Sequence, residues 1–217
     1  MAKRPIFVAH EAPPFYRTVW GEFVFNPGFA AVQKQKNIVA LHDAYQQISD
    51  DTPLEISSKS LQPEGICLSA FHLEKQVPSL GCSVPVECAY QGSKVFETGG
   101  PFTDLYLKTP REAKRDSRLA ANGKIVSFHF EGNTCSTLPV SCFYDWLYIR
   151  ALIENPSLSR ALLAYSAFTD IEFNPEKSIN CQARAAAVFV ALSRLQLLEQ
   201  TERFEDFRVL FMKGANQ

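Results

Sequence analysis

The stretch Gln182 to Leu198, QARAAAVFVALSRLQLL, decides how the rest of the chain must fold. Within it, residues 185–192 read AAAVFVAL, so a helix over this segment is apolar on most of its surface. A helix of that kind is stable only when other elements cover it. We therefore predict a central buried helix with the remaining elements packed around it.

The other predicted elements are short and of both types. The patterns predict strands over residues 5–9, 19–25, 54–57, 66–73 and 124–130, and helices over 31–48, 86–96, 109–118, 141–153 and 157–165. Ser141 and Ser157 are predicted helix caps. Four residues of 141–153 are core candidates, namely Trp146, Leu147, Ile149 and Leu152. These elements indicate one α+β domain, mainly helical with a small sheet, in which residues 1–52 are an extension packed on residues 53–217.

Length and composition narrow the class of protein. With 217 residues, of which 46% are hydrophobic, the chain can bury a core. The net charge of −1 argues against bulk attraction to nucleic acid or acidic membranes. The six cysteines lack paired C-x-x-C spacing and nearby histidines, so they predict reduced thiols and no metal site. No apolar run is long enough for a membrane span, and we expect a cytoplasmic protein.

One local charge patch departs from this balance. Six basic residues between Lys108 and Lys124 stand against two acidic ones, a local net charge of +4. Helical spacing places Arg111, Arg115 and Arg118 on one face. The patch can contact phosphates or can be a solvated helix surface, and the pattern favours neither.

The segment Val86 to Phe96, VECAYQGSKVF, carries the first candidate site. Glu87, Gln91 and Lys94 follow one another at steps of four and three, so a helix presents all three on one face, joined by Tyr90. The opposite face holds small residues that permit close packing. Acids and amines on a polar face are often only solvated. Glu87 and Lys94, however, lie about 10 Å apart along the axis, and a ligand between them explains that spacing better than an ion pair.

A second candidate site lies in FTDIEFNP, residues 168–175. An extended chain places Asp170, Glu172 and Asn174 on one face, just before the start of the buried helix, where Asn180 and Arg184 are close. An acidic strand face is a common alternative without function. Paired acids beside a buried helix start are nevertheless a typical site layout, because close carboxylates can hold different protonation states.

Several motifs together resemble the NADAR family of the YbiA-like superfamily, and more closely the DarT-associated NADAR antitoxins. They are LEISSKS (54–60), LSAFHL (68–73), VECAYQGSKVF, GGPFTDL, REAKRDSR, FYDWLYI and FTDIEFNPEKSINCQARA. The resemblance runs from about Val19 to Leu198. The chain departs from it at Ala70, where many relatives have Asn, and at DIEFNP, where relatives have an acidic motif with Trp.

The resemblance implies an ADP-ribosyl glycohydrolase that removes ADP-ribose from guanine bases in DNA and so opposes a DarT-type toxin, which would be the cognate partner. It implies Glu87, Lys94 and a second acid as catalytic residues, with Asp170 taken as that acid and Glu172 also eligible. Lys94 would attack the anomeric carbon and form a Schiff base, or would pair with a phosphate. We take the first as the hypothesis.

The ADP-ribose and the DNA need further contacts, while no metal and no cofactor is expected. The expected substrate-binding residues are Ser58, Lys59, Ser69, Tyr90, Gln91, Arg118, Glu172, Asn174, Asn180 and Arg184. The DNA strand would cross the basic segment. Two other functions remain open. One is an N-glycosidase acting on a small phosphorylated metabolite of the riboflavin type, and the other is an antitoxin that acts only by binding its toxin.

Overall fold

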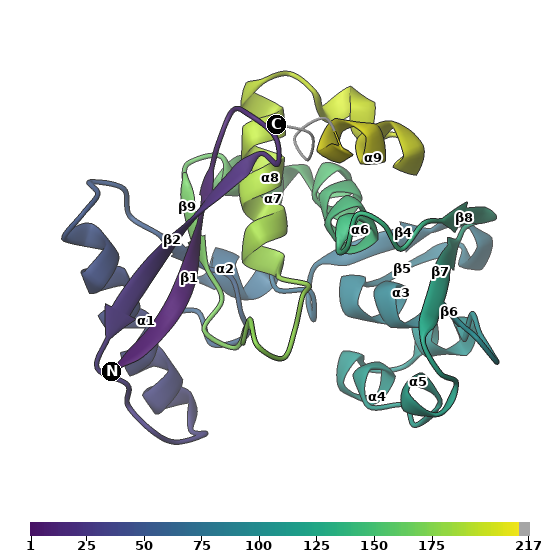
Figure 1. The fold of residues 1–217 in the computed structure, drawn as a ribbon, viewed down its shortest axis with the longest axis horizontal. Helices are drawn as coiled ribbons and strands as arrows, with labels where there is room; N and C mark the ends of the chain where they lie inside the picture. The colour runs from purple at the N-terminus through teal and green to yellow at the C-terminus, as the bar shows by residue number, and fades with distance from the viewer. Residues whose placement is uncertain (213–217) are drawn as a thin grey trace.

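The computed structural model describes residues 1–212, and its centre is the helix that the sequence predicts. Helix α8 (Gln182–Arg194) runs through the middle of the molecule, with β1 on one side and α6 on the other (Figure 1). Every residue from Ala183 to Leu192 is buried. The helix ends at Arg194, four residues before the predicted end. The α+β class is confirmed.

The main sheet joins the N-terminal segment to the middle of the chain. Its order is β2 (Tyr16–Phe23), β1 (Ala2–Ala9), β9 (Ala167–Thr169) and β3 (Leu54–Glu55). β1 is antiparallel to both β2 and β9, whereas β3 is parallel to β9. Residues 1–52 thus supply two strands of this sheet.

Helix α1 (Ala31–Gln46) covers the N-terminal part of this sheet. Ile38, Leu41 and Tyr45 pack with Ile6 and neighbouring residues in a hydrophobic cluster separate from the main core. The sequence predicts these three residues as the apolar face of the helix. The sequence also predicts Val32 on this face, but Val32, in the first turn of the helix, is 59% exposed.

The rest of the described chain forms short elements around α8. The strands are β4 (Glu74–Val77) with β5 (Cys82–Pro85), and β6 (Lys94–Phe96) with β7 (Ile125–Phe130) and β8 (Asn133–Cys135). The helices are α2 (Pro63–Cys67), α3 (Val86–Gly92), α4 (Pro110–Lys114), α5 (Arg118–Ala121), α6 (Cys142–Glu154), α7 (Pro156–Leu162) and α9 (Phe204–Met212). Short 3-10 turns are η1 (Pro78–Leu80), η2 (Thr103–Leu107) and η3 (Leu198–Thr201).

One predicted strand and two predicted helix caps differ from the structure. Residues 66–73 are the end of α2 and a series of turns, not a strand, since Pro63 begins a helix and Leu68 and Leu73 donate backbone hydrogen bonds to residues four positions back. Ser157 lies inside α7, whose cap position is Asn155. Ser141 does occupy the cap position of α6, but its hydroxyl donates to the Asp145 carboxylate and to no backbone group.

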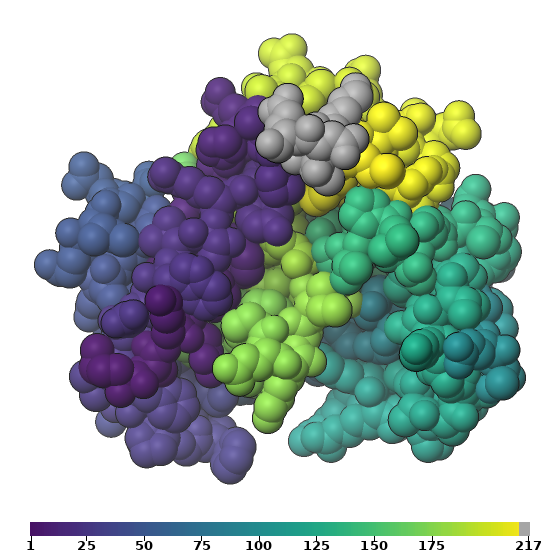
Figure 2. Space-filling view, in the orientation of Figure 1, coloured from purple at the N-terminus to yellow at the C-terminus, as the bar shows by residue number. Residues whose placement is uncertain are grey.

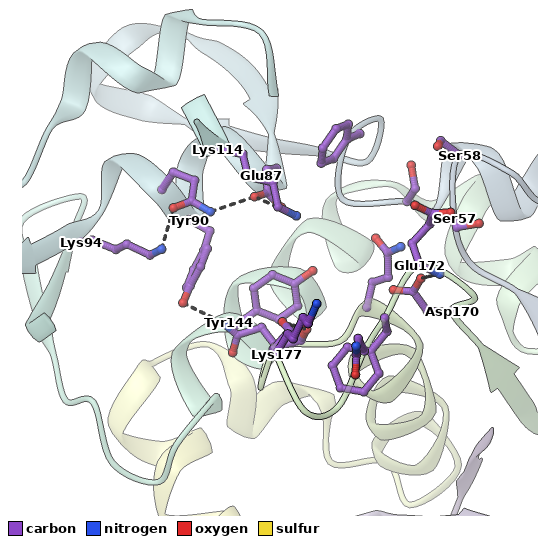
Figure 3. A pocket seen from close by; sticks show the side chains of 18 residues that line it. Ser57, Ser58, Glu87, Tyr90, Lys94, Lys114, Tyr144, Asp170, Glu172 and Lys177 are labelled. Carbon is purple, nitrogen blue, oxygen red and sulfur yellow. Dashed lines mark hydrogen bonds and ion pairs between the residues drawn. The ribbon is translucent and has the colours of Figure 1, made fainter. Parts of the chain in front are cut away.

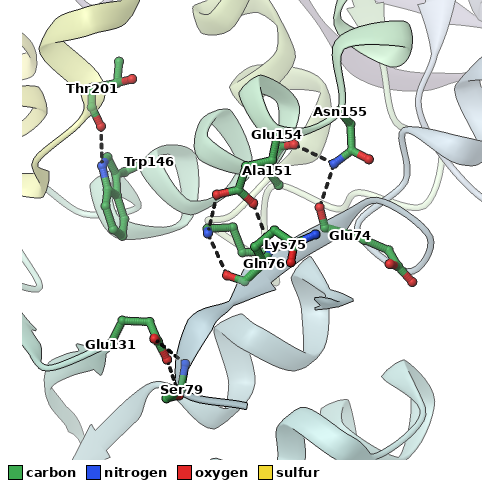
Figure 4. A network of polar contacts seen from close by, with 10 residues as sticks. All are labelled: Glu74, Lys75, Gln76, Ser79, Glu131, Trp146, Ala151, Glu154, Asn155 and Thr201. Carbon is green, nitrogen blue, oxygen red and sulfur yellow. Dashed lines mark hydrogen bonds and ion pairs between the residues drawn. The ribbon is translucent and has the colours of Figure 1, made fainter. Parts of the chain in front are cut away.

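Helix α6 holds the β4–β5 hairpin in place (Figure 4). The Lys75 ammonium donates to Glu154 Oε1 at 2.6 Å, and the Gln76 amide donates to Glu154 Oε2 at 2.8 Å. Asn155 adds a bond from its side-chain amide to the Glu74 carbonyl. Because β5 runs directly into α3, these contacts also fix where α3 begins. The four predicted core residues of α6 are all buried, as expected.

A depression marks the surface between residues near 170–181 and the teal segment near 90–120 (Figure 2).

In the described part of the chain, all six cysteines are free, with Cys67 and Cys82 exposed and the others buried. Within residues 1–212, no helix is both long enough and apolar enough to cross a membrane.

Candidate active site

The two candidate stretches of the sequence line a single pocket of about 570 Å³. Glu87, Tyr90, Gln91 and Lys94 come from α3 and the start of β6. Asp170, Glu172, Asn174 and Asn180 come from the loop between β9 and α8. Figure 3 shows Glu87 and Lys94 on one side of the pocket and Asp170 on the other, with Tyr144 between them. Groups from distant parts of the sequence thus face the same space.

An unbroken hydrogen-bond chain links the three polar residues of the first stretch. Gln91 Nε2 donates to Glu87 Oε1 at 2.8 Å, and Lys94 Nζ donates to Gln91 Oε1 at 2.6 Å. The prediction that all three lie on one helix is wrong for Lys94, because α3 ends at Gly92 and Lys94 begins β6. The Gln91 amide lies between Glu87 and Lys94 and bonds both.

Close packing behind α3 explains why the helix can present so many polar groups. A Cβ atom at Gly92 would collide with the Tyr106 ring of η2, so only glycine fits there. Cys88 and Ala89 on the same face are fully buried. The predicted face of small residues is therefore confirmed.

The Lys94 amine lies in a pocket that disfavours its charge. Burial lowers the pKa of Lys94 to about 8, the nearby Glu87 opposes the shift, and Lys114 adds to it. Its Nζ lies 4.6 Å from the centre of the Tyr90 ring. At pH 7 about a tenth of this amine is therefore unprotonated and nucleophilic, far more than of a lysine in water.

Lys114 reaches the pocket from helix α4. Its Nζ lies 3.7 Å from Glu87 Oε1 and 5.5 Å from the centre of the Phe71 ring. Helix α4 begins with a capping box, in which Thr109 and Glu112 bond each other's backbone amide groups. The sequence places Lys114 in the basic segment, but nothing in the spacing indicates that this lysine lies beside Glu87.

Asp170 and Glu172 have different surroundings, although the pattern makes them equivalent. Residues 170–174 are not the predicted strand, because β9 ends at Thr169 and a turn follows. Asp170 lines the pocket, and burial followed by the charge of Glu55 raises the pKa of its carboxyl. Glu172 is exposed, and Lys34 Nζ lies 3.1 Å from its Oε1.

The two walls of the pocket are tied together by polar bonds. Asn180 Nδ2 donates to the Tyr90 hydroxyl at 2.6 Å. Gln182, at the start of α8, donates to the Ile56 carbonyl and accepts from the Ala70 amide. These bonds hold the loop before α8 against α3 and against the segment around Ser57.

The family assignment follows from comparison of the whole sequence. The sequence model of NADAR-DarT1, described as the DarT1-associated NADAR antitoxin, matches residues 2–217. The chain belongs to this family. A comparison with curated proteins gave no match. The resemblance found in the separate motifs is thus confirmed over almost the whole chain.

Three residues expected to bind substrate do not line the pocket of the antitoxin. Arg184 is buried, and its NH2 group bonds Asp145 Oδ1 at 3.0 Å. Arg118 bonds Asp104 and Asp116. Lys59 follows the serines of the pocket but lies outside its wall. Both arginines already have carboxylate partners, which explains why they are not directed at the pocket.

The pocket of the antitoxin also contains residues that the site prediction does not include. They are Phe71, Lys114, Tyr144, Phe173, Lys177, Ser178 and Gln182, whereas Ser57 was expected together with Ser58 and Lys59 as a contact to the pyrophosphate. Tyr144 lies in the predicted core helix α6, and its spacing there is that of a core residue. In residues 1–212, histidine, cysteine and acidic side chains form no group of three or more that could hold a metal ion.

Proposed function

We propose that this antitoxin is a glycohydrolase that removes ADP-ribose from guanine bases in DNA and thereby reverses the modification made by a DarT-type toxin. The observation that carries the proposal is the placement of the Lys94 amine and the Asp170 carboxyl on opposite sides of one pocket (Figure 3). A nucleophile and an acid on opposite sides of a sugar can attack the anomeric carbon and protonate the leaving base.

The first step forms a bond between Lys94 Nζ and the anomeric carbon as the bond from that carbon to the guanine nitrogen breaks. The electron pair of the broken bond goes to the nitrogen, which takes a proton from Asp170. The raised pKa of Asp170 keeps that proton available near neutral pH. Positive charge develops on the ribose, and the Glu87 carboxylate on the Lys94 side stabilises it.

The second step releases the sugar. The bond from the anomeric carbon to the ring oxygen breaks and its electron pair stays on the oxygen, which takes a proton from the Lys94 nitrogen, so that this nitrogen forms a protonated Schiff base with the opened ribose. Water then adds to the same carbon, the amine leaves, and the proton that is released returns to Asp170. The products are ADP-ribose and the unmodified base, so the net reaction consumes one water. Gln91, hydrogen-bonded to both Glu87 and Lys94, keeps the two groups together throughout.

The remaining pocket residues suit the rest of ADP-ribose. Phe71, Tyr144 and Phe173 supply apolar and aromatic surface for the adenine or ribose. Hydroxyl and amide groups of Ser58, Ser69, Asn174 and Asn180 are available for the ribose hydroxyls and pyrophosphate, and Lys114 and Lys177 supply positive charge.

The test is incubation with an oligonucleotide that carries ADP-ribosylated guanine. We expect free ADP-ribose and restored guanine from the native protein, and a loss of at least about 100-fold in rate for Lys94→Met. Borohydride should trap an ADP-ribose adduct on Lys94. Lys36→Met, an exposed lysine on α1, is the matched control and should retain trapping.

Cells that carry the toxin distinguish catalysis from binding. If Lys94→Met folds and still protects them, the antitoxin acts by contact, and the proposal is wrong. Turnover of a phosphorylated N-glycoside without turnover of the modified DNA would indicate instead the metabolite N-glycosidase.

A further inference from the structure

A buried chain of polar side chains lies behind the pocket wall that carries Asp170. Its centre is Glu55 of β3, which is fully buried and is not among the residues that line the pocket. An isolated buried carboxylate is costly, so its partners show what it stabilises. The mechanism above gives Glu55 no role.

Glu55 holds the two residues that flank Asp170. The Thr169 hydroxyl donates to Glu55 Oε2 at 2.6 Å, and the Ile171 amide donates to Glu55 Oε1 at 2.9 Å. The pairing of β3 with β9 places Glu55 directly opposite Thr169. One carboxylate therefore holds the Thr169 side chain on one side of Asp170 and the Ile171 backbone amide on the other.

His42 of α1 extends the chain into the N-terminal segment. Its Nε2 lies 2.8 Å from Thr169 Oγ1. A threonine hydroxyl has one hydrogen, and here it is given to Glu55, so the hydrogen of the second bond belongs to His42 Nε2. Burial lowers the pKa of His42 to about 4, so the ring is neutral. Burial raises the pKa of Glu55, whereas hydrogen bonds from Thr169, Ile171 and Ser57 lower it, so we take Glu55 as the charged member of the pair that it forms with Asp170.

We propose that Glu55 is a positioning residue that fixes the Asp170 carboxyl at the pocket wall, and that Thr169 and His42 orient Glu55. This inference rests on the proposed function, in which Asp170 is the acid. Glu55 does not touch the substrate. It acts through the backbone around Asp170 and through its negative charge, which disfavours a second charge on Asp170.

Other titratable groups around Asp170 also act on its carboxyl. They are Glu172 in the same loop, Lys114 of α4, Tyr144 and Tyr148 of α6, and Cys181 just before α8. Glu172 is exposed and close to Lys34, and Lys114 is exposed and close to Glu87. Glu55 is the buried acid of this group, so its charge is the least screened by water.

The variant Glu55→Gln removes the negative charge of this side chain and keeps nearly the same shape. Glutamine can accept from the Ile171 amide and donate to Thr169 Oγ1. The hydroxyl then donates to His42 Nε2, and the ring must move its hydrogen to Nδ1. Nitrogen NMR of labelled histidine distinguishes these tautomers. We expect the Nε2–H form in the native protein and the Nδ1–H form in Glu55→Gln.

Two titrations complete the test. Carbon NMR should show that the Asp170 carboxyl loses its proton about one pH unit lower in Glu55→Gln than in the native protein. The high-pH limb of ADP-ribose release should move down by a similar amount, while the low-pH limb set by Lys94 stays in place. Asp43→Asn, which removes an exposed charge beside His42, is the matched control and should change neither the tautomer nor the Asp170 titration.

An unchanged tautomer together with an unchanged Asp170 titration in Glu55→Gln would overturn the inference. If that variant does not fold, Thr169→Val decides, because it removes the hydroxyl at similar volume. Without the Thr169 hydroxyl, His42 should no longer be held in one tautomer. If His42 keeps the Nε2–H form in this variant, the proposed hydrogen-bond series Glu55–Thr169–His42 is wrong. Both NMR measurements need no substrate, so a native protein that releases no ADP-ribose would refute the proposed function without deciding the role of Glu55.

Discussion

At the scale of single residues, the reactivity of the site depends on the charge state of Lys94. Glu87 raises its pKa and Lys114 lowers it, so the two neighbours act in opposite directions. We predict that Glu87→Gln moves the titration midpoint of the Lys94 amine below about 8 and that Lys114→Met moves it above that value. The rate at which acetic anhydride modifies Lys94, followed by mass spectrometry as a function of pH, measures the midpoint without any need for activity.

The direction in which the Lys94 midpoint moves shows whether a substitution acts by its charge or by changing access to the amine. A lysine amine reacts only when unprotonated, so modification should rise with pH through each midpoint. Lys36, on the exposed side of α1, is an internal reference whose profile should be the same in all three proteins. Shifts of both variants in the same direction would mean that the substitutions merely open or close the pocket.

At the scale of elements, the contact between α6 and α8 contains a buried ion pair. Asp145 is fully buried and Arg184 nearly so. We predict that Asp145→Ala lowers the free energy of unfolding by on the order of 3 kcal/mol, because the Arg184 guanidinium is then left buried without its carboxylate. Urea unfolding followed by circular dichroism measures the loss.

An exposed pair provides the matched comparison for this buried one. Lys3 and Glu22 link β1 to β2 at 3.5 Å, and both side chains are more than half exposed. Glu22→Gln should cost less than about 1 kcal/mol. Equal losses in the two variants would contradict the prediction, because the buried pair would then contribute no more than an exposed one. The double change Asp145→Leu with Arg184→Met should recover much of the stability, since it removes both charges together.

Sequence patterns were sufficient to predict some of these elements and not others. The apolar run of α8 and the spacing of Ile38, Leu41 and Tyr45 in α1 predict buried helices, because hydrophobic periodicity reports burial directly. Residues 66–73 misled the prediction, since a short apolar run fits a strand and a turn equally well. The end of α3 at Gly92 was missed because its spacing continues smoothly to Lys94.

At the scale of the whole molecule, the site depends on contacts between distant segments, which single-segment patterns do not report. Spacing predicted that Glu87, Gln91 and Asp170 carry the site, and all three line the pocket. Arg184 carries the same charge signal as a phosphate ligand, but its partner Asp145 is 39 positions away. Glu55 was missed because an acid in a two-residue strand has no sequence signature. His42 is linked to it only through the fold.

The basic face around α4 leads to a prediction about the whole complex with DNA. Arg111 and Arg115 are exposed beside the pocket residue Lys114, whereas the charge of Arg118 is paired with Asp104 and Asp116. If DNA crosses this face, each phosphate contact contributes about 0.9 to the salt slope of binding for a duplex, or about 0.7 for a single strand. We predict that Arg111→Gln with Arg115→Gln lowers the slope by between about 1 and 2.

Fluorescence anisotropy with labelled DNA at several salt concentrations measures this slope. Arg203→Gln, which changes an exposed arginine just before α9, is the control and should leave the slope unchanged. An equal slope in the native and doubly substituted proteins would place the DNA on another face.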